Sequence, residues 1–150
     1  MSNDDIIDTL NDLIETSKDG EYGFRTSAEY LKDPTLKQSF TTRAEECRQA
    51  AAELQQLVVG LGGDAEDGGT AAGALHRGWV AVKGTLAGYT DKAILEETER
   101  GEDSALASYR KALDEALPPD VRVAVERQYE GVKRNHLQIR TLRDAARAAV

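Results

Sequence analysis

The sequence predicts an all-α protein, folded as an antiparallel four-helix bundle with one long crossover between the second and third long helices. Aromatic residues make up only 5% of the chain, which is typical of helical bundles. Along four long segments, apolar residues recur at alternating steps of three and four, the spacing of one buried helix face. Two short proline-containing turns and one connection of roughly thirty residues separate these segments. We therefore expect residues 1–150 to form a single domain without a sheet.

The first long helix is predicted over residues 4–32, with Asn3 or Asp4 as its N-cap. Its buried face turns small and polar near the middle. This face consists of Ile6, Leu10, Leu13, Ser17, Gly20, Phe24, Ser27 and Leu31. Glu21 lies on a neighbouring apolar stripe between two glycines. Two glycines in one helical turn indicate a close approach by another helix or a local irregularity.

The second long helix is predicted over residues 35–61, after a break at Asp33-Pro34. Cys47 lies on its buried face, and Glu46 lies at the edge of that face. No His or Lys lies one helical turn from Cys47 to lower its pKa. We therefore interpret Cys47 as a small buried apolar side chain and not as a nucleophile.

The connection between the second and third long helices is rich in glycine, and a short helix is predicted within it over residues 71–87. This helix carries His76 and Trp79, three residues apart. We interpret it as a cap that packs over the bundle by its tryptophan ring.

The third long helix, predicted over residues 91–117 with Asp91 as its N-cap, carries an unusual glutamate. Glu102 falls in the middle of the apolar face, where a carboxylate must be paired, hydrogen-bonded, protonated or bound to a cation. The charged residues Glu96, Glu97, Glu99 and Asp103 are expected to be solvated, or paired with Arg100 and Lys92.

The last helix is predicted over residues 120–148, after the Pro118-Pro119 turn. Gln128 and Asn135 interrupt its apolar face, and His136 lies on the flank.

Helix geometry brings the polar exceptions of all four helices to one height. Short turns make the first two long helices antiparallel and likewise the last two, which is the single-crossover topology of ferritin-like folds. At 1.5 Å per residue, Glu21, Glu46, Glu102 and His136 all fall roughly 26 Å from one end of the bundle.

Composition and charge favour an acidic cytoplasmic protein. The formal charge of -8 and the pI near 4.8 disfavour binding to nucleic acid or to an anionic membrane. The N-terminal residues have neither a basic nor an apolar region of the kind found in signal peptides, and no apolar run approaches the ~20 residues needed to span a bilayer. A lone cysteine agrees with a reducing compartment.

Four stretches of the sequence resemble a bacterial family of uncharacterised four-helix-bundle proteins in the ferritin-like group. They are Asp19-Gly20-Glu21-Tyr22-Gly23-Phe24, Leu75-His76-Arg77-Gly78-Trp79, Leu95 to Asp103 and Tyr129 to His136. The resemblance covers nearly the whole chain and implies a ferritin-like fold, without an established activity. Ferritin-like di-iron proteins use a Glu on each of two helices and a Glu-x-x-His on each of the other two. Glu21 and Glu102 match the two lone glutamates.

The second and fourth helices depart from that di-iron pattern. Glu45 is followed three residues on by Arg48, Glu46 by Gln49, and His136 is preceded by Lys133.

Two interpretations of function follow. The favoured one is a non-catalytic, stress-associated or interaction protein that forms a homodimer. Its buried polar layer is structural, with Glu102 paired to His136, Lys133 or Arg25 and helped by Gln128. The alternative is a reduced ferritin-like metal site that binds Fe, Mn or Zn through Glu21, Glu102 and His136, with Glu46 as a further ligand.

Hydrolytic enzymes are set aside. The two histidines of the chain, His76 and His136, have no nucleophile at local spacing.

Overall fold

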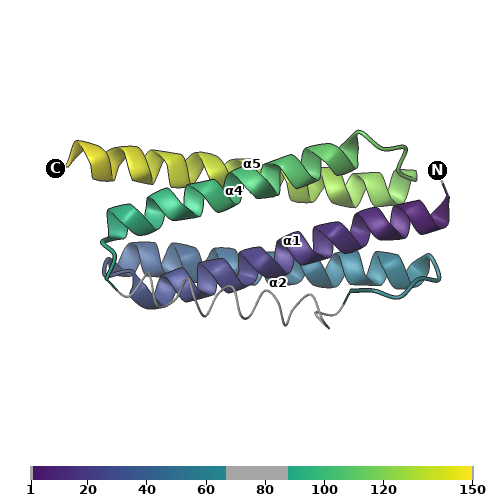
Figure 1. Ribbon diagram of the computed structural model, residues 1–150, viewed down its shortest axis with the longest axis horizontal. Helices are drawn as coiled ribbons and strands as arrows, with labels where there is room; N and C mark the ends of the chain where they lie inside the picture. Colours follow the sequence, from purple (N-terminus) through teal and green to yellow (C-terminus); the bar gives the residue numbers. More distant parts are fainter. Residues whose placement is uncertain (1, 67–87, 150) are drawn as a thin grey trace.

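The protein folds as a four-helix bundle, seen in a computed structural model that describes residues 2–66 and 88–149. Its helices are α1 (Asn3–Tyr30), α2 (Pro34–Gly60), α4 (Asp91–Leu113) and α5 (Pro119–Ala148). Figure 1 shows α1 beside α2 and α4 beside α5, so that the bundle consists of two helical hairpins. Within the described ranges the structure contains helices and no strand, which confirms the predicted all-α bundle. The predicted helix over 71–87, with His76 and Trp79, lies outside the described residues.

Capping side chains fix where the first two helices begin. The Ser2 hydroxyl accepts a hydrogen bond from the Asp5 amide at 3.2 Å, and the Asp5 carboxylate accepts one from the Ser2 amide at 3.2 Å. This reciprocal capping box makes Ser2 the N-cap in place of the expected Asn3 or Asp4. In α2, the Asp33 carboxylate accepts from the Thr35 amide at 2.8 Å, and Pro34 is the first helical residue.

Asp91, the first residue of α4, forms hydrogen bonds to the α1–α2 turn. Thr90 is the N-cap of α4, because its hydroxyl accepts from the Ala93 amide at 3.2 Å. Asp91, the expected cap, instead accepts from the backbone amides of Lys32 at 2.8 Å and Asp33 at 3.0 Å. The Asp91 side chain therefore ties the second hairpin to the turn of the first.

Helix α4 is shorter than predicted, since it ends at Leu113 and not at 117. Proline at 118 disfavours helical geometry at the residue before it, and the chain unwinds ahead of the Pro118-Pro119 turn. Leu117 thereby enters the core from an irregular segment, with only 7% of its surface exposed.

The apolar core consists of two separate clusters. One lies around Leu10, Leu13, Val58, Tyr109 and Val125, toward the N-terminal end of α1. The other lies toward the opposite end and includes Phe24, Phe40, Cys47, Ile94 and Ile139. Polar side chains from all four helices occupy the region between the clusters.

None of the described helices is both long and apolar enough to cross a membrane.

Candidate functional site

A chain of polar side chains links all four helices beside the first apolar cluster. The buried Tyr109 hydroxyl of α4 donates to Gln128 Oε1 of α5 at 2.8 Å and lies 3.4 Å from the Ser17 hydroxyl of α1. Gln128 Nε2 donates in turn to Glu53 Oε1 of α2 at 2.7 Å, and Arg127 also pairs with Glu53. Burial raises the pKa of Tyr109 to about 12, so the phenol stays protonated and serves as a donor. This network holds the two hairpins in register.

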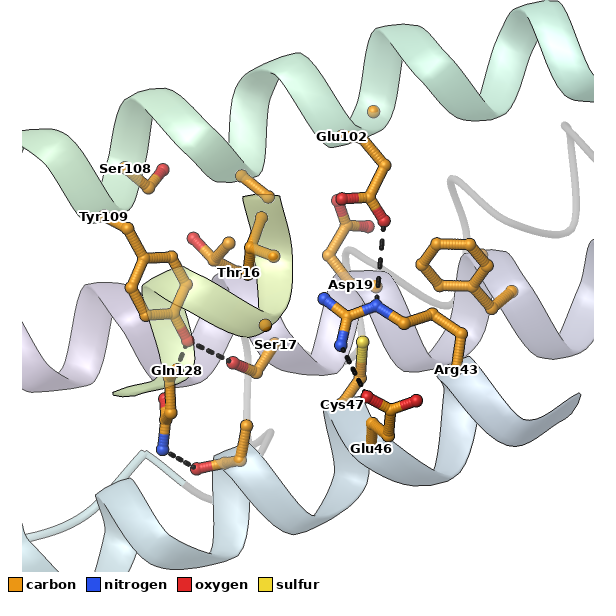
Figure 2. A pocket seen from close by; sticks show the side chains of 18 of the residues that line it. Thr16, Ser17, Asp19, Arg43, Glu46, Cys47, Glu102, Ser108, Tyr109 and Gln128 are labelled. Carbon is orange, nitrogen blue, oxygen red and sulfur yellow. Dashed lines mark hydrogen bonds and ion pairs between the residues drawn. The ribbon is translucent and has the colours of Figure 1, made fainter. Parts of the chain in front are cut away.

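A second polar group lies beside it and is incompletely satisfied. Glu102 of α4 is 4% exposed and accepts a hydrogen bond from Asn135 Nδ2 of α5 at 2.7 Å. The Arg43 guanidinium reaches from α2 toward Glu102, with Nε 3.9 Å from Oε1, and toward Glu46, with Nη1 3.6 Å from Oε2 (Figure 2). Both distances exceed the length of a normal hydrogen bond. Among the described residues, neither Arg43 Nε nor Glu102 Oε2 has a hydrogen-bond partner, although both atoms are buried.

The environment of Glu102 shifts its protonation equilibrium. Burial raises the pKa of this carboxyl, while the Arg43 charge and the Asn135 hydrogen bond oppose the rise. Arg43, Asn135 and His136 therefore favour the charged form of Glu102 against the effect of burial.

These polar side chains line a cavity of about 650 Å³ between the two hairpins. Figure 2 shows Arg43, Glu102, Tyr109 and Gln128 around this space. Small residues make the room: Gly20, Gly23, Ala50, Gly101, Ala105 and Gly131 all line it. A Cβ added at Gly101 would meet no atom within 4 Å. By contrast, a Cβ at Gly20 would lie 3.0 Å from Cys47 Sγ, so at this position the glycine allows α1 to approach α2 closely, as its position in the sequence suggested.

The structure places the four residues of the predicted metal site in different surroundings. The Glu21 carboxylate pairs with Arg25 at 2.6 Å on its own helix. The Glu46 side chain is 52% exposed. His136 Nε2 lies 2.7 Å from the exposed Asp103 carboxylate. Glu102 alone of the four lies within the buried layer.

The direct partners of Glu102 differ from those expected. We expected His136, Lys133 or Arg25 beside it, with help from Gln128, but the structure pairs it with Arg43 and Asn135, while His136 acts on it electrostatically. Gln128 belongs instead to the Tyr109 network.

Arg43 is the functional residue that sequence reasoning missed. It lies three residues after Phe40 and four before Cys47, which puts it on the buried face of α2, and this spacing was the available signal. Its aliphatic stem allows burial, and its guanidinium lies 5.8 Å from the centre of the Phe24 ring.

Glu99 was also misassigned as solvated or paired with a neighbour on its own helix. It is 7% exposed and pairs with Arg143 and Arg140 of α5. The interpretation of Cys47 is confirmed: it is 5% exposed, and burial raises its pKa to about 11.

Comparison with known protein families finds a match over residues 5–115 to a family described as a domain of unknown function (DUF2383). The chain belongs to this family. A comparison with curated proteins finds no match. Among solved structures, the chain is similar to a mutant of Dps1 from Mycobacterium smegmatis. The TM-score is 0.77 at 14% sequence identity, over 95% of this chain and 99% of that one. At this identity the likeness shows the fold, which is the ferritin-like four-helix bundle that the topology and the family resemblance implied.

Proposed function

We propose that this DUF2383 protein is a non-catalytic binding protein that holds a small organic molecule in its mid-bundle cavity. One observation carries the proposal. A buried arginine and a buried glutamate line a cavity of about 650 Å³, and each has an atom without a hydrogen-bond partner among the described residues. Buried polar groups are nearly always hydrogen-bonded, and exceptions concentrate at functional sites.

The volume and the lining of the cavity support binding. Its volume falls within the range of about 300–1,000 Å³ that is typical of small-molecule sites. Phe24, Ala50, Ala105 and Val132 give it apolar wall, while a few side chains supply convergent polar atoms. Sites between the helices of a bundle commonly combine these two properties.

The ferritin-like fold also suggests a metal centre, but the residues present do not fit one. Within residues 2–66 and 88–149, no three His, Cys, Asp or Glu side chains gather closely enough to hold a metal ion. The buried carboxylate of Glu102 already faces the guanidinium of Arg43 at 3.9 Å. A divalent cation at Glu102 would be repelled by that fixed positive charge. Binding or oxidation of Fe, Mn or Zn is therefore the disfavoured alternative.

Two measurements on one preparation test the proposal. We expect protein purified without chelator to carry no stoichiometric Fe, Mn or Zn, and to oxidise Fe(II) no faster than buffer. We also expect some members of a fragment library to bind the wild-type protein in ligand-observed NMR, but not the cavity-filling variant Ala105→Leu. Stoichiometric metal that is lost in Glu102→Ala would replace the proposal with the metal alternative. Equal fragment binding by wild type and variant would exclude the cavity as the site.

Self-association into a dimer and a role in stress stay predictions from the sequence. Sedimentation equilibrium measures the first directly. Growth of a deletion strain under oxidative, osmotic and starvation conditions measures the second.

A further inference from the structure

We infer that the ligand of this cavity is a neutral planar molecule that presents a hydrogen-bond acceptor beside a donor, as an amide, a lactam or a nucleobase edge does. This inference rests on the proposed function and names the class of ligand. It follows from the unsatisfied atoms, the charge of the wall and the apolar surfaces around them.

The two unsatisfied atoms need opposite hydrogen-bond partners. Arg43 Nε carries an N–H that needs an acceptor, and Glu102 Oε2 needs a donor. Arg43 and Glu102 come from different hairpins and lie 3.9 Å apart at their nearest charged atoms. Both atoms are closed off from solvent, so the Arg43 and Glu102 side chains must turn toward the cavity on binding. A ligand edge that carries C=O next to N–H then satisfies both, because the carbonyl accepts from Arg43 and the N–H donates to Glu102.

Charge argues against an ionic ligand. Four of the acidic side chains in the described wall are already paired: Glu53 with Arg127, Glu97 with Arg100, and Glu46 and Glu102 with Arg43. An anion bound at Arg43 would lie against the carboxylate of Glu102 and would be disfavoured. A cation bound to Glu102 would lie against the buried guanidinium of Arg43 and would also be disfavoured. A neutral ligand leaves the existing ion pair in place.

The walls next to the ion pair favour a flat ligand. Phe24 and Val132 are buried there, and the small side chains of Ala50 and Ala105 line the same space. Planar rings bury much apolar surface while they lose few internal rotations, so they suit a slot between helices.

Three probes of nearly the same shape test the charge and donor pattern: benzamide, benzoate and benzamidine. Benzamide presents an acceptor beside a donor, benzoate only acceptors and benzamidine only donors. We expect benzamide to bind wild-type protein with a Kd near ~1 mM at pH 7, and to bind about tenfold more tightly than the other two. Backbone amide chemical shifts in two-dimensional NMR would report both the affinity and the location, with the largest changes at Gly101 and Gly131.

Two charge variants make the test sharper, because each should change the preferred probe. Glu102→Gln removes the negative charge and should raise the affinity for benzoate by about tenfold, through pairing with Arg43. Arg43→Met leaves Glu102 alone and should raise the affinity for benzamidine by about the same factor. Arg48→Met, which removes an exposed arginine of the same helix, should leave the order of the three probes unchanged. If Arg43 and Glu102 had only a structural role, these substitutions would not change which probe binds best.

Failure of this inference and failure of the proposed function are distinguishable. If benzoate or benzamidine binds wild type best, or if the order is the same in all the proteins, the donor–acceptor inference is wrong while the cavity still binds ligands. If none of the three probes shifts wild-type resonances more than those of Ala105→Leu and Ala50→Leu while other fragments do, only the donor–acceptor inference is wrong. If no fragment does so, both are wrong. Two filling variants on different helices are used, each checked by circular dichroism, so that one misfolded variant does not decide the result.

Discussion

Replacing Arg43 with methionine measures how far the buried Glu102 depends on its arginine. At 3.9 Å and an effective dielectric constant near 20, the attraction between two unit charges is about 4 kcal/mol. Removing Arg43 therefore leaves a buried carboxylate with Asn135 as its remaining partner among the described residues. Methionine keeps most of the apolar stem, so the loss of packing is small.

Protonation sets a ceiling on this loss. An unfolded glutamate has a pKa of about 4.3, so binding a proton at pH 7 costs about 3.7 kcal/mol. A folded protein that cannot stabilise the charge will take up that proton instead. We therefore expect Arg43→Met to lose about 3 kcal/mol of unfolding free energy at pH 7, and only about 1 kcal/mol at pH 5.

The direction of the pH dependence follows from the pKa of Glu102, which burial raises. A carboxyl whose folded pKa is raised binds protons more tightly in the folded state. Between the unfolded and folded pKa values, stability therefore falls as pH rises. Without Arg43 the pKa of Glu102 rises further, and the decline becomes steeper and extends to higher pH.

Urea unfolding at pH 5, 6, 7 and 8 provides the assay, with a double-mutant cycle as its internal check. Arg43→Met/Glu102→Gln should lie within about 1 kcal/mol of wild type, because neither position then carries a charge and Asn135 keeps an acceptor. Arg48→Met removes an exposed pair on the same helix and should have little effect at any pH. Destabilisation by Arg43→Met that is equal at pH 5 and pH 7, or a double variant as unstable as the single one, would refute the reasoning.

Four further predictions concern two glycines, the Asp91 side chain and the cysteine. Gly101→Ala should stabilise the protein by about 0.5–1 kcal/mol in urea unfolding, since its Cβ meets no atom. Gly63→Ala should destabilise it by about 1–3 kcal/mol, because its Cβ would lie 2.6 Å from Ile7 Cδ1. Asp91→Ala should lower the free energy of unfolding by about 1–2 kcal/mol and speed amide hydrogen exchange in the α1–α2 turn, because two backbone amides lose their acceptor. Unchanged exchange would contradict this role of Asp91. At pH 8, iodoacetamide should label Cys47 at least a few hundredfold more slowly than in the urea-unfolded chain, because burial raises its pKa to about 11; equal rates would contradict this.

The sequence predicts the helices well because their signals are local. Apolar spacing, Pro34 and the Pro118-Pro119 turn each act within a few residues, and the helix ends differ from the prediction by at most four residues. The largest difference, at the end of α4, arises because Leu117 packs into the core without helical geometry. Tertiary packing overrides helical periodicity at that point.

The site is harder to predict because its partners come from different helices. Glu102 could be recognised from its own helix, since a carboxylate on an apolar face needs a partner. The identity of that partner depends on the rotation of α2 and α5, which no single helix determines. Arg43 and Glu46 lie three residues apart, about 60° around α2, so a modest rotation of the helix decides which of them faces the core, and the structure buries Arg43.

The buried polar layer is less stabilising than continuous apolar packing would be at the same place. Ala50 and Ala105 line the cavity with small side chains, and larger apolar side chains at these positions would extend core packing through the middle of the bundle. The Arg43–Glu102 pair is also replaceable, because neutral residues of similar volume avoid the desolvation of two charges. The Tyr109 network already fixes the register of the four helices, so the second polar group is not needed for that purpose. A layer that is both underpacked and incompletely hydrogen-bonded is what a binding site requires before its ligand arrives, and this combination favours binding over a purely structural role.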